Sequence, residues 1–378
     1  MKFLIAPDKF KGSLRAEEVA DNIALGIRDA IPGAEIDTAP MADGGEGTAK
    51  AICRARGGMW VTCGAHDPLG DPIEASYVWL EKNASAVMEM SEAAGMRRIK
   101  NDVPDILRAN TFGVGEMLLD AVRRGAREVI IGLGGSATND GGTGMARALG
   151  FKFLAHGESE LTDVASLVNL ARIIPAVAAG VSPANRSQVQ PARLPLQLEI
   201  LAAVDVRNPL LGCNGATHTF GPQKGATREQ LDILERALAK LADVTARDLG
   251  HDFRDKPGAG AAGGLGFGLM SFCNAEVQPG FEVVAEAVGL EDKIARADVI
   301  ITGEGKLDRQ TLEGKTPAGV ANLARKCGKQ VFAIVGRAEA NSKARDLFDG
   351  VYELAGPIPA AAELLRERAR ELGSTLQR

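Results

Sequence analysis

The sequence has few aromatic residues, scattered cysteines and no long hydrophobic run. Aromatic side chains make up 4% of the 378 residues, and the five cysteines form no C-x-x-C pair, which argues against a disulfide framework or a zinc site. No apolar run approaches about 18 residues, so we expect no membrane span, and residues 3–6 are too short for a signal peptide. A net charge of −5 argues against a nucleic-acid partner. We therefore expect a globular, cytoplasmic protein.

Glycine, by contrast, is abundant, with 45 residues and no collagen period. Strand and helix patterns alternate at both ends of the chain, which is typical of a parallel α/β sheet. The four-residue spacing of Val19, Ile23, Ile27 and Ile31 indicates a helix. We expect strands over 3–6, 35–39, 298–302, 330–335 and 351–354, and helices over 19–31 and 316–328.

The middle of the chain has closely spaced strand patterns and fewer helices. Strands are expected over 60–63, 73–80, 85–90, 128–133 and 198–204, with helices over 115–124 and after a capping box at Thr227 and Gln230. This pattern of strands and helices predicts a mixed-sheet α/β domain, 56–284, inserted into a parallel-sheet domain made of 1–55 and 285–378. Residues 182–197, rich in proline and polar side chains, are expected to form a mobile loop.

Glycine clusters that also hold carboxylates, amides or lysines are where we expect chemistry, because glycine turns and helix N-termini present backbone N–H groups to anions. The first cluster follows the first strand, at the sheet edge where α/β proteins bind ligands. There Lys9 and Lys11 would meet a phosphate or carboxylate, and Asp8 a metal or hydroxyl. The alternative is a polar loop in which Ser13 caps the next helix.

The second cluster, 41–48, has two acids, Asp43 and Glu46, among glycines that include Gly44 and Gly45. This composition suits a hydroxyl or magnesium held close to the backbone. An acidic turn that caps the following helix is the alternative.

The third cluster, 132–142, follows an apolar strand and suggests an anion cradle with a metal ligand. Ser136 is not the nucleophile of a G-x-S-x-G motif, because Thr138 stands where the second glycine is needed. A tight strand-to-helix turn without a ligand is the alternative.

The last two clusters resemble nucleotide-binding motifs only in part. Residues 258–268 contain G-x-G-x-x-G but follow no strand, so a phosphate-wrapping or hinge loop fits better, with close packing of small residues as the alternative. Gly303, Glu304 and Gly305 are expected to form a turn near Asp308 and Lys315, and the alternative is capping and turn chemistry. Arg309 stands where a Walker A glycine would be required.

Seven ordered motifs across the chain resemble the bacterial glycerate kinase family. They are APDKFKGSL (6–14), PMADGGEGT (40–48), GLGGSATNDGG (132–142), NPLLG (208–212), FGPQKGAT (220–227), GAGAAGGLGFGL (258–269) and ITGEGKLDRQT (301–311). The resemblance implies transfer of the γ-phosphoryl group of ATP to D-glycerate with Mg²⁺, chiefly at the 2-hydroxyl. It also implies a flavodoxin-like domain from both chain ends, a second inserted α/β domain, and an active site in the cleft between them.

Roles follow for the residues in these motifs. Asp43 or Asp140 would accept the hydroxyl proton, and Asp205 and Glu304 would hold magnesium. Phosphate or the glycerate carboxylate would bind to Lys11, Lys224 and Lys315, and the backbone cradle would be Gly134, Gly135, Gly263 and Gly264. Further candidates for binding glycerate or ATP are Asp8, Lys9, Ser13, Gly44, Gly45, Glu46, Ser136, Thr138, Asn139, Gly303, Gly305 and Asp308.

The chain departs from the family pattern at Arg207, where a second acid often follows Asp205, and in the stretch 182–197, which is longer than usual. The residues leave three alternatives open: a glycerate 3-kinase, a kinase of another small hydroxy acid, and a non-catalytic binder of small anions. The sequence also leaves the oligomeric state open.

Overall fold

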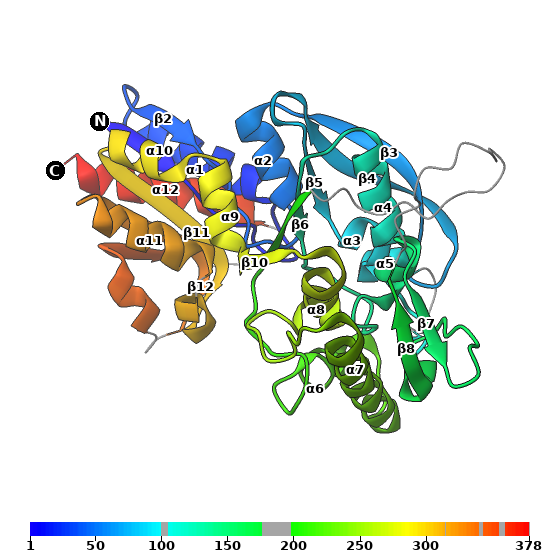
Figure 1. Cartoon of the computed structure of the whole chain (residues 1–378). Helices are drawn as coiled ribbons and strands as arrows, with labels where there is room; N and C mark the ends of the chain where they lie inside the picture. Colours follow the sequence, from blue (N-terminus) through cyan, green and yellow to red (C-terminus); the bar gives the residue numbers. More distant parts are fainter. Residues whose placement is uncertain (100–104, 176–197, 314, 340–342, 355–359, 378) are drawn as a thin grey trace. The chain divides into compact units, whose positions relative to one another are not determined.

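Figure 1 shows the protein as a computed structural model. The structure describes residues 1–99, 105–175, 198–313, 315–339, 343–354 and 360–377. The loop predicted over 182–197 lies outside the described residues. No helix in the described ranges is both long and apolar enough to cross a membrane.

The chain divides into two compact units. Unit 1 comprises Met1–Gly57 and Pro279–Arg378, and unit 2 comprises Gly58–Gln278. The sequence patterns had suggested boundaries near residues 55 and 285. Unit 1 has one sheet with a hydrophobic core on each face, and unit 2 has two sheets and one large core.

Unit 1 contains a five-stranded sheet, in which the neighbouring strands run parallel in the order β2-β1-β11-β12-β13. Its strands are β1 (Lys2–Ile5), β2 (Glu35–Thr38), β11 (Val299–Leu307), β12 (Gln330–Ala338) and β13 (Gly350–Glu353). Numbered within the unit, the order is 2-1-3-4-5, that of flavodoxin-like folds. In such folds the ligand binds where the strand order reverses, which here is between β1 and β11. The predicted fold class is confirmed.

Helices pack on both faces of this sheet, because successive side chains of a strand point to opposite faces. Phe3 and Ile5 pack with α1 (Ala16–Ala30) and α12 (Ala361–Leu376). Leu4 belongs to the opposite core, which is formed with α2 (Thr48–Arg56), α9 (Gly280–Ala287), α10 (Leu290–Arg296) and α11 (Thr316–Lys326). Ser13 does not cap α1, because the N-cap is Arg15, whose backbone N–H donates to Glu18 (2.8 Å).

Strand β11 is longer than predicted, and the expected turn at Gly303, Glu304 and Gly305 is wrong. The strand continues through Leu307 beside β12, with Glu304 opposite Val335. Gly303 is needed for close approach between the strands, because a Cβ there would lie 2.2 Å from the carbonyl oxygen of Ile334. Glu304 is therefore held by a strand rather than by a loop.

Unit 2 contains a mixed six-stranded sheet in the order β10-β9-β6-β5-β4-β3, together with a separate antiparallel pair. The pairs β3–β4 and β4–β5 are antiparallel, whereas β5–β6 and β6–β9 are parallel. The strands are β3 (Met59–His66), β4 (Pro72–Leu80), β5 (Ser85–Glu89), β6 (Glu128–Gly132), β7 (Lys152–Ala155), β8 (Leu170–Ile174), β9 (Glu199–Val204) and β10 (Glu276–Pro279). The mixed sheet agrees with the sequence prediction.

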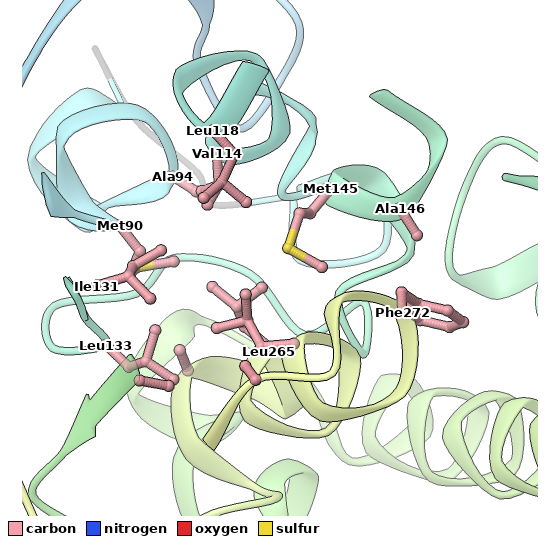
Figure 2. Close-up of a cluster of buried hydrophobic side chains, with 14 of the residues drawn as sticks. Met90, Ala94, Val114, Leu118, Ile131, Leu133, Met145, Ala146, Leu265 and Phe272 are labelled. Atoms are coloured by element: carbon pink, nitrogen blue, oxygen red, sulfur yellow. The ribbon is translucent and has the colours of Figure 1, made fainter. Parts of the chain in front are cut away.

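The helices of unit 2 surround a single large core. They are α3 (Ser91–Ala94), α4 (Phe112–Arg123), α5 (Thr143–Ala148), α6 (Ala216–Phe220), α7 (Arg228–Leu249) and α8 (Ala261–Cys273). The capping box predicted for α7 is present, because Thr227 Oγ1 accepts from the Gln230 N–H and Gln230 Oε1 accepts from the Thr227 N–H. Figure 2 shows Ile131, Leu133 and Leu265 within this core. The apolar contacts fix the start of the glycine-rich segment 132–142.

Short 3₁₀ segments complete both units. They are η1 (Glu81–Asn83), η2 (Met96–Arg98), η3 (Ala165–Asn169), η4 (Pro222–Lys224), η5 (Arg309–Glu313) and η6 (Lys343–Leu347).

Residues 258–268 lie partly in helix α8, which is assigned from Ala261. The helix is irregular at Ala262, Gly263 and Gly264, which have left-handed backbone angles. A Cβ at Gly263 would lie 1.9 Å from the carbonyl oxygen of Thr138. This contact supports the alternative of close packing at Gly263, whereas the phosphate-wrapping or hinge role stays a prediction.

Candidate active site

A cavity of about 540 Å³ lies in unit 1, lined by residues from the carboxyl ends of its parallel strands and from the loops that follow them. It brings together nine of the predicted site residues: Asp8, Lys9, Lys11, Ser13, Asp43, Glu304, Gly305, Asp308 and Lys315. The sequence interpretation missed the other lining residues, which are Phe10, Lys306, Gly336, Arg337, Leu354, Ala361 and Leu364. The cavity lies where flavodoxin-like folds bind their ligands.

Asp8, which lines this cavity, is a buried carboxylate, 7% exposed. Its backbone N–H donates to the carbonyl oxygen of Gly303 (2.8 Å), and its Oδ1 accepts from the N–H of Lys9 (2.7 Å). Burial, followed by the nearby charge of Asp43, raises the pKa of Asp8 to about 7, against the lowering effect of Lys9. The hydroxyl of Thr316, at the start of α11, is buried close to Asp8 and makes no well-formed hydrogen bond with the described residues.

Glu304 is a second buried carboxylate in the cavity. Its Oε1 accepts a hydrogen bond from Thr311 Oγ1 (2.6 Å). Burial raises the pKa of Glu304 to about 7, although the Thr311 hydrogen bond and the charge of Lys315 oppose the shift. Two carboxyl groups with raised pKa values in one cavity are typical of functional sites.

The cavity is also lined by cationic side chains, four lysines and one arginine. Lys9 Nζ donates to the carbonyl oxygen of Glu46 (2.7 Å), and Lys306 Nζ lies 3.0 Å from Asp308 Oδ2. Lys11, Lys315 and Arg337 line the same space. This arrangement can neutralise a polyanion while keeping carboxylates close to it.

The carboxylates of the cavity fit a magnesium ion only if a bound substrate supplies further oxygen ligands. Carboxylate oxygens such as those of Glu304 are preferred ligands of Mg²⁺. Within the described ranges, no group of three or more His, Cys, Asp or Glu residues is arranged to hold a metal. Mg²⁺ commonly takes one or two carboxylates and completes its shell with phosphate oxygens and water. The other predicted ligand, Asp205, is exposed in unit 2, as is Arg207.

In unit 2, the Asp140 carboxylate is buried and accepts four hydrogen bonds from neighbouring groups. Its Oδ2 accepts from the N–H (2.9 Å) and Oγ1 (2.8 Å) of Thr111 and from the N–H of Gly144 (2.9 Å). Its Oδ1 accepts from the N–H of Gly142 (3.1 Å). The Asp140 carboxylate thus ties the first turn of α5 to the residue before α4.

Lys224 and three predicted residues of the third cluster form a buried polar group in unit 2. Lys224 Nζ donates to the carbonyl oxygen of Thr138 (2.7 Å) and to Ser136 Oγ (3.3 Å). Burial lowers the pKa of Lys224 to about 7, although the charge of Asp140 opposes this shift. Asn139 Nδ2 donates to Thr217 Oγ1 (3.0 Å), and Asn139 Oδ1 is buried without a partner in the described part of the chain.

The predicted glycines lie in different surroundings. Gly44 and Gly45 belong to the turn between Asp43 and Glu46, and Gly303 is inside β11. Gly134 is half-buried and Gly135 is exposed, whereas Gly263 and Gly264 are buried in α8.

Comparisons with known proteins agree with this geometry. A family model described as the glycerate kinase family matches residues 3–378. The chain is 39% identical to the glycerate kinase of Bacillus subtilis over 100% of this chain and 98% of that protein. It is 42% identical to the glycerate 2-kinase of Escherichia coli K12, over 89% of this chain and 85% of that protein.

A solved structure extends the similarity to the fold. A crystal structure of a glycerate kinase 2 candidate from Salmonella typhimurium LT2 superposes with a TM-score of 0.83 at 38% identity, covering 100% of this chain and 98% of that one. The sequence and structural similarities both span the whole chain. The chain therefore belongs to the glycerate kinase family and is a kinase, a phosphotransferase.

Proposed function

We propose that this enzyme transfers the γ-phosphoryl group of ATP to the 2-hydroxyl of D-glycerate, giving 2-phospho-D-glycerate in the cytoplasm. The observation that carries the proposal is the cavity of unit 1, in which lysines, an arginine and buried carboxylates converge at the carboxyl edge of a parallel sheet. The preference for the 2-hydroxyl is supported by the name of the E. coli relative.

The cations of the cavity would bind the triphosphate. Phosphoryl transfer depends mainly on positioning and on neutralising the charge spread over the phosphate oxygens. Lys11, Lys315 and Arg337 come from three different segments of unit 1 and line one cavity, so together they can neutralise the several charges of a triphosphate. Lys315 also precedes α11, whose N-terminus favours negative charge.

We assign the proton-accepting role to Asp43. It lines the cavity, is half-buried, and lies close enough to Asp8 to raise the pKa of that carboxyl. Asp140, the other candidate, accepts four internal hydrogen bonds, so its oxygens are already occupied. Asp8 would position the substrate hydroxyl beside Asp43.

Magnesium would be held by Glu304 together with phosphate oxygens, and it would supply positive charge to the transferred group. Glu304 is suited to this role because its strand and the Thr311 hydroxyl fix its orientation. Asp205 stays a prediction as a second ligand.

The proposal is tested by following ADP release in a coupled assay. The enzyme should release ADP only when D-glycerate is present, and Lys315→Met should raise the KM for ATP. Lys343→Met is the matched control, because Lys343 is an exposed lysine of unit 1 that does not line the cavity. Purified, folded enzyme that binds glycerate without consuming ATP would instead indicate a non-catalytic anion binder.

A further inference from the structure

The cavity of unit 1 has an apolar part, which the charged groups described above do not explain. Its lining includes four apolar side chains from the loop after β1, the residue after β13 and the first turn of α12: Phe10, Leu354, Ala361 and Leu364. Phe10 belongs to the core on the face of the sheet that α12 covers, and Leu354 packs against that core. Among the described lining residues, none from the β13 and α12 side carries a charged or hydrogen-bonding side chain. This part of the cavity therefore suits an uncharged group.

The same cavity is larger than a chain of phosphates needs. Its volume of about 540 Å³ lies within the range of about 300–1,000 Å³ that is typical of pockets for drug-sized ligands. Its lining residues come from or follow all five strands of the sheet. Neighbouring strands lie about 4.8 Å apart, so the edge of the sheet from β1 to β13 is about 14 Å wide. A ligand that occupies this width is elongated, as a nucleoside triphosphate is.

Two cations occupy the middle of this edge. Lys306 on β11 lies directly opposite Arg337 on β12, the strand between β11 and β13, and two like charges on adjacent strands repel each other. Lys306 Nζ lies 3.0 Å from Asp308 Oδ2, but the Arg337 side chain has no hydrogen bond or ion pair within the described residues. Glu353, which interacts electrostatically with Arg337, is paired with Arg345. An anion bound beside Arg337 would offset the repulsion.

We infer that the apolar part of the cavity binds the base of the nucleotide, and that Lys306 and Arg337 bind the phosphates nearest to the ribose. The inference rests on the function proposed above, in which ATP is the phosphoryl donor. A base is uncharged and gains free energy when apolar side chains remove its rings from water. The strand order then directs the γ-phosphate toward β1 and β2, the strands that Asp8 and Asp43 follow.

The inference is tested by measuring the affinities of the full-length enzyme for ATP and for inorganic tripolyphosphate, which has the phosphate chain without the nucleoside, by isothermal titration calorimetry. Leu354→Ala and Leu364→Ala should each weaken ATP binding by about three- to tenfold, because each removes apolar contact with the base. The affinity of both variants for tripolyphosphate should stay within about twofold of the parent. Arg337→Met should instead weaken the binding of both ligands by about tenfold, because it removes a charge that both contact.

Leu376→Ala is the matched control, because Leu376 is a half-buried leucine at the other end of α12 that does not line the cavity. If Leu354→Ala does not fold, Leu364→Ala carries the test. Unchanged ATP affinity in the folded leucine variants, or an equal loss for ATP and tripolyphosphate, would overturn the inference. A loss confined to ATP, in a protein whose parent releases no ADP with D-glycerate, would support this site while contradicting the proposed function.

Discussion

The backbone N–H of Asp8 donates to the carbonyl oxygen of Gly303 across 2.8 Å, which joins the loop after β1 to the carboxyl half of β11. This contact lies at the point where the strand order of unit 1 reverses. It brings the carboxyl groups of Asp8 and Glu304, from opposite ends of the chain, into one cavity. The following predictions test the roles that this arrangement gives to individual residues.

Asp43→Asn should lower kcat by about a hundredfold or more, because an amide cannot accept the hydroxyl proton. Steady-state kinetics with D-glycerate measures the effect, and the urea midpoint of unfolding should stay unchanged. Asp292→Asn, an exposed carboxylate on α10, is the control and should keep normal kinetics. A folded Asp43→Asn enzyme with the kcat of the parent would rule out this base.

Asp140→Asn should mainly destabilise unit 2. An asparagine offers one acceptor oxygen where Asp140 uses two, so part of its hydrogen bonding to Thr111, Gly142 and Gly144 is lost. The expected loss is about 1–3 kcal/mol in the free energy of unfolding, measured with urea. Thr111→Val should act in the same direction. If stability is unchanged while kcat collapses, Asp140 is the base instead.

Asp8→Asn should raise the Tm at pH 8 while lowering activity. The pKa of Asp8 is about 7 in the folded protein and near the ordinary 3.8 when unfolded. Between these values the folded state binds more protons, so the contribution of Asp8 to stability falls as pH rises from about 4 through 7. An asparagine does not titrate, so the Asp8→Asn protein does not lose stability in this way. Its Tm at pH 8 is expected to be a few degrees higher than that of the parent.

Thermal unfolding at pH 5 and pH 8 measures this difference. The advantage of Asp8→Asn should shrink at pH 5, where the native carboxyl is already protonated. Asp292→Asn provides the comparison for an exposed acid. An Asp8→Asn protein that is less stable than the parent at pH 8 would show that the carboxylate is stabilised by its surroundings.

Lys224 is a candidate to bind the glycerate carboxylate, and if it does so, the KM for glycerate should rise between pH 6.5 and 8.5. The pKa of Lys224 is lowered to about 7 by burial, against the opposing charge of Asp140, so its positive charge is lost as pH passes 7. A carboxylate binds the charged form, so affinity falls with rising pH. Lys224→Arg should flatten the profile, because a guanidinium stays protonated. The same rise in the arginine variant would assign the pH dependence to another group.

The sequence predicts the sheet of unit 1 and much of its cavity because both follow from local patterns. Apolar runs identify parallel strands, and the polar residues that follow parallel strands meet at one edge of the sheet. Asp8, Lys11 and Asp43 were found in this way and line one cavity. Which loops follow the carboxyl ends of the strands can be read from the sequence alone, without knowledge of tertiary contacts.

Other features depend on partners that are distant in sequence. The Gly303-Glu304-Gly305 segment looks like a turn, but its neighbour β12 extends it as a strand. Lys306 and Arg337 were missed because they are far apart in the sequence. They lie directly opposite each other only when β11 and β12 pair. The burial of Lys224 and the four hydrogen bonds to Asp140 likewise arise from tertiary contacts.

The central claim is phosphorylation of the 2-hydroxyl of D-glycerate, and phosphorus NMR of the reaction product tests it most directly. A phosphate on carbon 2 is coupled to a single proton, so the proton-coupled signal should be a doublet that grows as ATP is consumed. A triplet would contradict the claim, because it reports two protons and therefore phosphorylation of the 3-hydroxyl. Purified enzyme that gives no new phosphorus signal with D-glycerate would contradict the kinase assignment itself.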